Sequence, residues 1–205
     1  YKQALRQVLE VVHLLRKEDI DLEYLDLGGG FGIRDEEEGM DVQKLAEALL
    51  PLLARSGLRL VLEPGRYLAG EAGLLLTRVH GVKRSGEKVF VITDAGMNDL
   101  LRPSHYGAYH PVDPVVEMED RKEEVVDVVG PVCETGDLLA RDRSLRLPRK
   151  GELLAVGNAG AYGFTMASNY NARLRPAEVM VEDGAVHLIR ARETYQDLIR
   201  GETIP

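Results

Sequence analysis

The chain has 205 residues, of which 44% are hydrophobic, and its 26 basic and 34 acidic side chains give a formal charge of -8. That apolar content supports one large folded domain or two smaller ones and excludes a disordered chain, and the negative balance leaves no basic stripe for nucleic acid. No apolar stretch reaches the roughly 20 residues that cross a bilayer, so no membrane partner is expected, and the single cysteine, Cys133, agrees with a reducing, cytoplasmic location.

The first 70 residues alternate predicted helices with predicted strands. In chain order these are a helix over residues 1–17, a strand over 22–27, a helix capped by Asp41 that closes near Gly57 and has Pro51 as a candidate kink, and a strand over 59–62. This order predicts a parallel α/β arrangement, in which functional groups gather where strands end. Because a closed barrel of this type needs eight strands, residues 1–70 are expected to be only part of one. The acidic run over 35–38 is expected to be a solvated loop.

From residue 71 onward the pattern changes to that of a β-rich second domain, expected over residues 71–205. Strands are predicted over 74–82, 89–93, 125–129, 153–156, 179–181 and 186–189. Ser85-Gly86 and Asp183-Gly184 stand between neighbouring strands as hairpin turns. Residues 194–200 are predicted to form a short terminal helix.

Four glycines within five residues, Gly28, Gly29, Gly30 and Gly32, follow the first predicted strand. Without Cβ atoms, successive backbone amides can turn inward together and approach an anion such as a phosphate closely. Glycine-rich turns after strands also occur simply to make room for packing. The run alone therefore leaves both a phosphate site and a packing role open.

Glu63 and Arg66 flank the turn Pro64-Gly65 at the end of the second predicted strand. A carboxylate suits a protonated heterocyclic nitrogen, and a guanidinium suits phosphate or carboxylate. The alternative is a surface salt bridge beside a turn, which contributes little to stability. We favour the functional interpretation, since both loops are expected at the same edge of one sheet.

Residues 102–109 have no clear strand pattern and are predicted to form a long loop, of the kind that often binds ligands. Arg102 and Tyr106 are candidates to hold a substrate carboxylate there. The alternative is an ordinary exposed loop. His105 and His110 lack partners at metal-ligand spacing, so no metal site is predicted.

Two more candidate groups follow later predicted strands. Cys133 places a thiol beside Glu134, although a lone cysteine is more commonly a small buried hydrophobe than a reactive group. Tyr162 stands among glycines, where its hydroxyl can meet an anion or its ring can simply pack. Composition alone favours the structural role for Cys133 and leaves Tyr162 undecided.

Taken in order, these motifs resemble those of diaminopimelate decarboxylases. The stretches that carry the resemblance are Leu27–Gly32, Glu63–Arg66, Arg102-Pro103 with Tyr106–Ala108, Cys133-Glu134 with Gly136-Asp137, and Gly160–Gly163. Some of them also fit ornithine and arginine decarboxylases, but residues 162–171 and Arg192-Glu193-Thr194 look specific to diaminopimelate. The family belongs to the alanine-racemase-like, fold-type III enzymes. The resemblance therefore implies the C-terminal part of a TIM barrel over residues 1–70, followed by a C-terminal β domain over 71–205.

The resemblance implies that meso-2,6-diaminopimelate loses CO2 to give L-lysine, with pyridoxal 5'-phosphate as the cofactor. The cofactor-binding residues that it implies are Gly29, Gly30, Glu63, Gly65, Arg66 and Tyr162, with Glu63 against the pyridine nitrogen and the others around the phosphate. The substrate-binding residues that it implies are Arg66, Arg102, Tyr106, Glu134 and Tyr162. Glu134 would meet the distal ammonium group, and Cys133 would supply the proton that replaces the lost carboxylate.

In this family the residues that match Cys133 and Glu134 reach the cofactor of the neighbouring subunit, which implies a homodimer with shared sites. The family's cofactor-bearing lysine would lie upstream of Tyr1, and neither Lys83 nor Lys88 occupies a motif that replaces it. The chain is therefore expected to be a fragment that is active only with the N-terminal half present. The alternatives are a related ornithine, arginine or carboxynorspermidine decarboxylase and a non-catalytic dimerising regulator.

Overall fold

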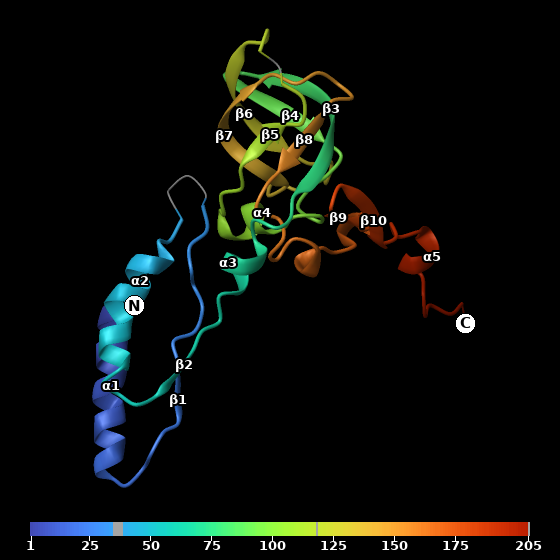
Figure 1. The fold of residues 1–205 in the computed structure, drawn as a ribbon. Coiled ribbons are helices and arrows are strands. Elements are labelled where there is room, and N and C mark those ends of the chain that lie inside the picture. The colour runs from blue at the N-terminus through green and yellow to red at the C-terminus, as the bar shows by residue number, and fades with distance from the viewer. Residues whose placement is uncertain (35–38, 118, 205) are drawn as a thin grey trace. The chain divides into compact units, whose positions relative to one another are not determined.

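The computed structural model describes residues 1–34, 39–117 and 119–204, and the chain divides into two compact units, Tyr1–Gly70 and Glu71–Pro205 (Figure 1). Each unit has its own hydrophobic core and is described by itself. The acidic run 35–38, expected to be a solvated loop, lies outside the described residues. In the part of the chain that is described, no helix is both long and apolar enough to cross a membrane.

The first unit packs two helices on a pair of parallel strands. Its elements are α1 (Lys2–Lys17), β1 (Tyr24–Asp26), α2 (Val42–Leu53), β2 (Arg59–Val61) and α3 (Gly65–Ala69). Figure 1 shows α1 and α2 on the same side of the strands, where the buried side chains are Leu5, Val12, Leu25, Leu49, Leu53 and Leu58. The predicted alternation of helix and strand is therefore confirmed, and β1 pairs with β2 in parallel.

Local chemistry explains the ends of these elements. The side chain of Asp41 accepts a hydrogen bond of 3.0 Å from the backbone N–H of Lys44, so the predicted cap of α2 is confirmed. Pro51 lies inside α2, which ends at Leu53 rather than near Gly57. Both strands are shorter than predicted, with three residues each.

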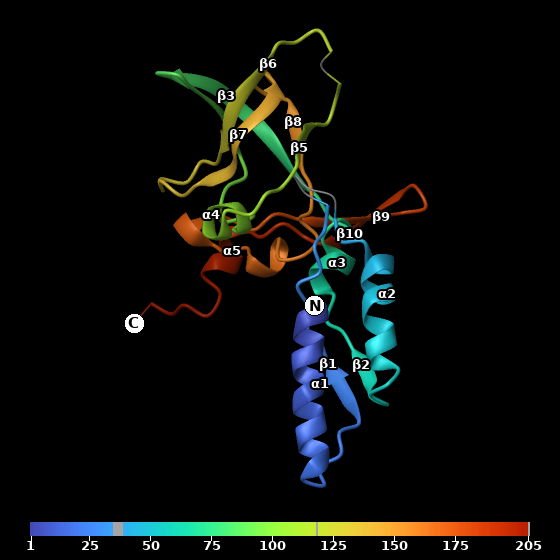
Figure 2. The same ribbon diagram turned by 90° about the vertical axis from the view of Figure 1, so that its left-hand side faces the viewer.

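The second unit contains a six-stranded sheet that curls almost into a barrel (Figure 2). Its strands are β3 (Leu75–Ser85), β4 (Lys88–Thr93), β5 (Val112–Pro114), β6 (Glu123–Val129), β7 (Leu138–Arg146) and β8 (Leu153–Val156). Their order is β5-β8-β3-β4-β6-β7, and every pair is antiparallel except β4 with β6. The two edge strands, β5 and β7, also contact each other, so one core fills the interior.

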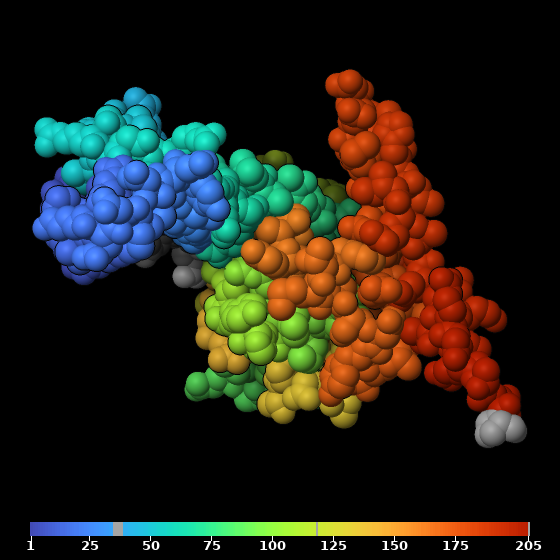
Figure 3. All heavy atoms as spheres, turned by 90° about the horizontal axis from the view of Figure 1, so that it is seen from below, coloured from blue at the N-terminus to red at the C-terminus, as the bar shows by residue number. Residues whose placement is uncertain are grey.

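The C-terminal residues form a separate hairpin and a short helix. The hairpin consists of β9 (Glu178–Glu182) and β10 (Ala185–Arg190), joined by the predicted turn Asp183-Gly184, and α5 (Tyr195–Leu198) follows behind a capping box on Thr194. Figure 3 shows these residues, in orange-red and red, standing out as an arm from the rest of the unit. The predicted hairpin and terminal helix are thus confirmed.

The structure corrects the prediction for residues 102–109. A long loop was expected there, but Arg102–Tyr106 forms the short helix α4, which Gly107 closes with a φ of 61°. The left-handed conformation of Gly107 is one that glycine adopts without strain, and it ends the helix after five residues. Strands β5 and β7 were not predicted.

Candidate functional site

In the first unit, the two strand tips lie side by side. The backbone N–H of Glu63 donates a hydrogen bond of 2.9 Å to the carbonyl oxygen of Gly28, which extends the parallel pairing beyond β1 and β2. At Gly29 the two chains are so close that an added Cβ would lie 2.6 Å from the carbonyl oxygen of Glu63. Gly28 and Gly30 have φ values of 68° and 83°. This bare stretch of backbone therefore requires glycine for two separate reasons.

Aromatic residues hold the glycine run in place. The ring of buried Phe31 lies between those of Tyr1 and Tyr67, with centroid distances of 5.4 and 6.3 Å. The hydroxyl of Tyr1 donates a hydrogen bond of 2.5 Å to the carbonyl oxygen of Gly29. The glycine run is thus held by the packing of Phe31 and by the hydrogen bond from Tyr1.

Glu63 and Arg66 border the same strand tips. The turn between them begins α3, and the N–H of Gly65 donates a hydrogen bond of 2.8 Å to the carbonyl oxygen of Glu63. Within the described residues, neither side chain forms an ion pair or hydrogen bond, so the salt bridge considered as an alternative does not form between them. A carboxylate and a guanidinium, neither paired with any residue that the structure describes, thus stand beside a backbone surface that only glycine can form.

In the second unit, a buried carboxylate shapes the turn that carries Cys133 and Glu134. Asp137 is 5% exposed, and its two carboxylate oxygens accept hydrogen bonds of 2.7 Å from the N–H of Met97 and 2.6 Å from the N–H of Val132. Such charge-assisted bonds tie the turn to the loop that follows β4. Cys133 itself is exposed, so the prediction of a small buried hydrophobe is wrong.

Two glycines allow this arrangement. Gly96 and Gly130 pack directly against the Asp137 carboxylate, and a Cβ on either would collide with it. In the sequence Asp137 is only the last residue of the motif Gly136-Asp137, and the pattern predicts no role for it. Its glycine neighbours, Gly96 and Gly130, are distant from it in the sequence, so its role becomes apparent only once the structure brings them together.

Arg102 and Tyr162 come together, although 60 positions separate them. The guanidinium carbon of Arg102 lies 5.6 Å from the centroid of the Tyr162 ring, a cation–π contact between α4 and the loop after β8. Ser104 of the same helix lies against Gly136, where an added Cβ would be 3.0 Å from its Oγ. Helix α4 therefore adjoins both the loop of Tyr162 and the turn of Cys133 and Glu134.

The two tyrosines predicted for this site are accessible. Tyr106 is exposed at the end of α4, with its ring edge-to-face against His105 at 4.6 Å. Tyr162 is 48% exposed and has a φ of 61°, a backbone conformation that costs energy for a residue with a side chain. Backbone strain of this kind is common where a structure aims a side chain at a ligand.

One further contact was missed by the sequence analysis. The hydroxyl of Tyr170 donates a hydrogen bond of 3.3 Å to Oε2 of Glu134. Tyr170 lies in the stretch 162–171, which the sequence analysis singled out as a motif without assigning this residue a function. No spacing rule connects positions 134 and 170, because the contact depends on the path of the loop between them.

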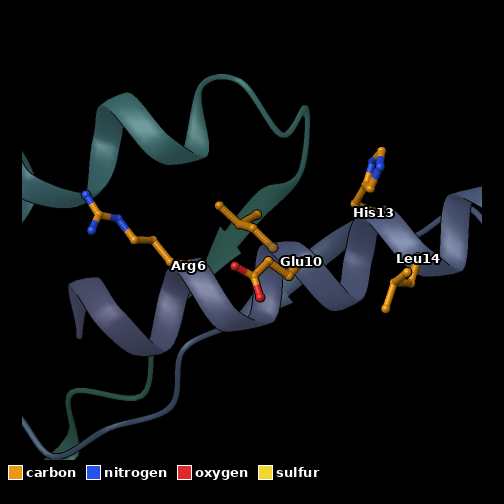
Figure 4. A pocket seen from close by; sticks show the side chains of 5 residues that line it. Arg6, Glu10, His13 and Leu14 are labelled. Carbon is orange, nitrogen blue, oxygen red and sulfur yellow. The ribbon is translucent and has the colours of Figure 1, made fainter.

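The cavities do not coincide with the predicted residues. A cavity of about 590 Å³ lies on α1, where Figure 4 shows Arg6, Glu10, His13 and Leu14 along its lining. A second cavity, of about 480 Å³, is lined by Phe164, Arg175, Pro176, Arg190, Ala191, Arg192, Glu193, Asp197 and Arg200. Neither contains a predicted site residue, so the hydrogen bonds and close contacts above define two separate groups of candidate residues, one within each unit.

Comparisons with known proteins agree on one relationship. The family model described as "Pyridoxal-dependent decarboxylase, C-terminal sheet domain" matches residues 14–160. The diaminopimelate decarboxylase of Aquifex aeolicus is 49% identical over 201 residues, which cover 97% of this chain and 48% of that protein. The diaminopimelate decarboxylase of Neisseria meningitidis serogroup B is 48% identical over 201 residues, covering 98% of this chain and 48% of that protein.

A solved structure gives the same result. The crystal structure of diaminopimelate decarboxylase from Helicobacter pylori complexed with L-lysine superposes with a TM-score of 0.88 at 40% identity, covering 97% of this chain and 49% of that chain. The chain thus spans about half the length of the curated relatives it matches.

Proposed function

The chain belongs to the pyridoxal-dependent decarboxylase family, and from this premise we propose that it acts within a diaminopimelate decarboxylase, which converts meso-2,6-diaminopimelate to L-lysine and CO2. The observation that carries the proposal is the contact of Arg102 with Tyr162 beside the turn of Cys133 and Glu134. Cationic, phenolic, thiol and carboxylate groups there face solvent from neighbouring segments. The substrate carries two carboxylates and two ammonium groups, so it needs charges of both signs for recognition.

The first unit is suited to the phosphate and ring nitrogen of pyridoxal 5'-phosphate. The backbone at Gly29 leaves no room for a Cβ, and Gly30 and Gly65 continue the surface on which phosphate oxygens would rest beside the Arg66 guanidinium. Glu63 would keep the pyridine nitrogen protonated. The bound cofactor supplies an electron-accepting ring that stabilises the negative charge left when CO2 departs.

The second unit is suited to the substrate. Arg102 and Tyr106 hold the distal carboxylate together with Arg66, because a guanidinium and a phenol both donate hydrogen bonds to carboxylate oxygens. Tyr162 adds a further hydroxyl for the cofactor phosphate and the substrate. Glu134 accepts hydrogen bonds from the distal ammonium group, and the exposed thiol of Cys133 delivers the proton that replaces the lost carboxylate.

The proposal includes two partners. The first is an N-terminal half, which supplies the lysine that binds the cofactor covalently. The second is another copy of the enzyme, since Cys133 and Glu134 serve the neighbouring subunit's cofactor in the family that the motifs resemble. Chain coverage of about half of each relative supports the first partner.

The test is to express the chain together with the N-terminal half of a close relative. We expect the copurified complex to show the visible absorbance of bound cofactor and to release CO2 and L-lysine from meso-diaminopimelate. Replacing Cys133 with Ala should lower kcat at least tenfold while cofactor absorbance is retained. A complex that binds the cofactor but acts faster on ornithine or arginine than on diaminopimelate would contradict the proposal.

A further inference from the structure

Tyr170, which contacts Glu134, lies in a loop that several hydrogen bonds hold in place. Tyr170 begins a 3₁₀ turn, Tyr170–Ala172, in which Asn171 and Ala172 have φ values of 58° and 52°. Left-handed backbone is unfavourable for residues other than glycine, more so for Ala172 than for Asn171. The rest of the structure must therefore hold this turn in place.

Glu193 provides most of that hold. Its Oε2 accepts hydrogen bonds of 2.6 Å from Nδ2 of Asn169 and 2.8 Å from the backbone N–H of Arg175, and its Oε1 accepts one of 2.6 Å from Nε of Arg175. Asn169 also donates a bond of 2.9 Å to the carbonyl oxygen of Arg173, which closes the loop on itself. The Glu193 carboxylate thus binds Asn169, just before the turn of Tyr170, and Arg175, just after it.

Hydrogen bonds to backbone carbonyls in the loop after β4 also hold this segment. The N–H of Ser168 donates a hydrogen bond of 2.9 Å to the carbonyl oxygen of Asn98, and Nη2 of Arg173 donates one of 2.5 Å to the carbonyl oxygen of Asp94. Both acceptors lie in the loop after β4, the same loop that Asp137 ties to the turn of Glu134. Tyr170 and Glu134 are therefore anchored to one common segment.

Glu193 remains charged at any working pH. Hydrogen bonds from Arg175 lower its pKa to about 2. Arg175 and Arg190 also stack on the ring of Phe164, at 5.4 and 4.4 Å from its centroid, along the wall of the second cavity. The ion pair between Glu193 and Arg175 is thus supported by the ring of Phe164.

We propose that Tyr170 is a positioning residue that fixes the Glu134 carboxylate for the distal ammonium group of the substrate, and that Glu193 is the clamp that keeps Tyr170 in place. The inference rests on the proposed role of Glu134. It joins the two stretches, 162–171 and Arg192-Glu193-Thr194, that looked specific to diaminopimelate in the sequence. Besides the bond from Tyr170 on its Oε2, Glu134 accepts a bond of 3.4 Å from the N–H of Gly136 on its Oε1. A carboxylate held in this way presents its remaining lone pairs in a fixed direction, which favours a substrate with an ammonium group at that place over one without it.

The experiment uses the complete enzyme and the variant Tyr170→Phe, which removes only the hydroxyl. We expect KM for meso-diaminopimelate and Kd for L-lysine, measured by calorimetry, to rise about three- to tenfold, while kcat and Tm stay close to those of the wild type. The matched control is Tyr195→Phe, in which an exposed tyrosine of α5 that makes no side-chain hydrogen bond within the described structure is changed in the same way. It should leave all four quantities unchanged.

A double-mutant cycle separates positioning from general damage. In a Glu134→Gln background, Tyr170→Phe should change lysine affinity by less than a factor of two, since the group it positions has lost its charge. Glu193→Gln should raise KM in the same direction, whereas Glu178→Gln, which removes the nearby ion pair with Arg190, should not.

The outcomes that would overturn the inference differ from those that would overturn the proposed function. If the wild-type complex is active on diaminopimelate but Tyr170→Phe leaves KM and lysine affinity unchanged, the positioning role is refuted. An equal effect of Tyr170→Phe with and without the Glu134 charge refutes it too. A wild-type complex with cofactor but without activity on diaminopimelate refutes the proposed function instead.

Discussion

At the level of single residues, Gly29 gives the most direct test of the backbone surface in the first unit. Its φ is ordinary, so Gly29→Ala acts only through the Cβ, which would lie 2.6 Å from the carbonyl oxygen of Glu63. Overpacking of this kind costs about 1–3 kcal/mol and has to move the strand tip that carries Glu63. We expect the affinity of the complete enzyme for pyridoxal 5'-phosphate, titrated by absorbance, to fall about tenfold or more.

The control for this prediction is Gly81→Ala in β3, because a Cβ there meets open space and the φ of Gly81 is also ordinary. It should leave cofactor affinity unchanged. Wild-type affinity in Gly29→Ala would show that the close approach at Gly29 plays no part in binding.

The residues of the site differ in how far the sequence could predict them. The approach of Glu63 to the glycine run follows from two parallel strands ending at one edge, and it is confirmed by the bond between Glu63 and Gly28. Cys133 is exposed, whereas its residue type favoured burial. The sequence could not show this, because the exposure depends on how the buried Asp137 shapes the turn. Tyr170 was missed because its contact with Glu134 is set by a loop with irregular backbone angles.

At the level of elements, regular patterns were predicted correctly and interrupted ones were not. Strand β8 has the predicted bounds, and α1 differs from its prediction only by its first residue. Strand β7 was missed because Asp142, with a φ of 50°, breaks its alternation beside an irregularity in its pairing with β6. Strand β5 has three residues and ends in Pro114, and α4 is too short to show a helical period.

The β9–β10 hairpin is an element whose stability depends on its turn. Asp183 and Gly184 have φ values of 47° and 79°, the combination that a tight two-residue hairpin turn requires. An alanine in place of Gly184 would cost about 1–2 kcal/mol, and the strands bury too little to compensate, since Val186 is 70% exposed. We expect Gly184→Ala to lower hydrogen-exchange protection of the β9–β10 amides about tenfold, with little change in the Tm of the sheet domain.

Asp183→Asn is the matched control, because asparagine adopts the left-handed conformation as readily as aspartate. Its exchange protection should equal that of the wild type. If Gly184→Ala also keeps full protection, contacts outside the turn must stabilise the hairpin.

At the level of the whole molecule, both units supply groups to the proposed reaction. We assign glycine backbone, Glu63 and Arg66 of the first unit to the cofactor, and Arg66 to the substrate as well. To the second unit we assign the remaining substrate and proton-donor residues, of which Tyr162 also serves the cofactor phosphate. Both contributions depend on backbone that is fixed before any ligand arrives: at Gly29 by close packing and at the Cys133 turn by Asp137. Such preorganisation lowers the entropy lost on binding.

The stability of the second unit should depend on pH through the half-buried ion pair between Arg121 and Glu152. Glu152 accepts hydrogen bonds from Nη1 and Nη2 of Arg121 and, at 2.7 Å, from the N–H of Arg149, and these interactions lower its pKa from 4.5 to about 2. Because the pKa is lower in the folded state than in the unfolded state, Glu152 stabilises the fold fully above about pH 4.5, and this stabilisation is lost as the pH falls toward 2.

Glu152→Gln should therefore lower Tm at pH 7, and the difference from the wild type should shrink steadily between pH 5 and pH 2, as measured by thermal unfolding followed by circular dichroism. The control is Glu87→Gln in the β3–β4 turn, whose side chain has no ion pair or hydrogen bond in the described part of the chain, so its Tm should follow that of the wild type at each pH. A Tm difference for Glu152→Gln that stays constant down to pH 2 would mean that the loss arises from packing at Arg121, not from the charge of the carboxylate.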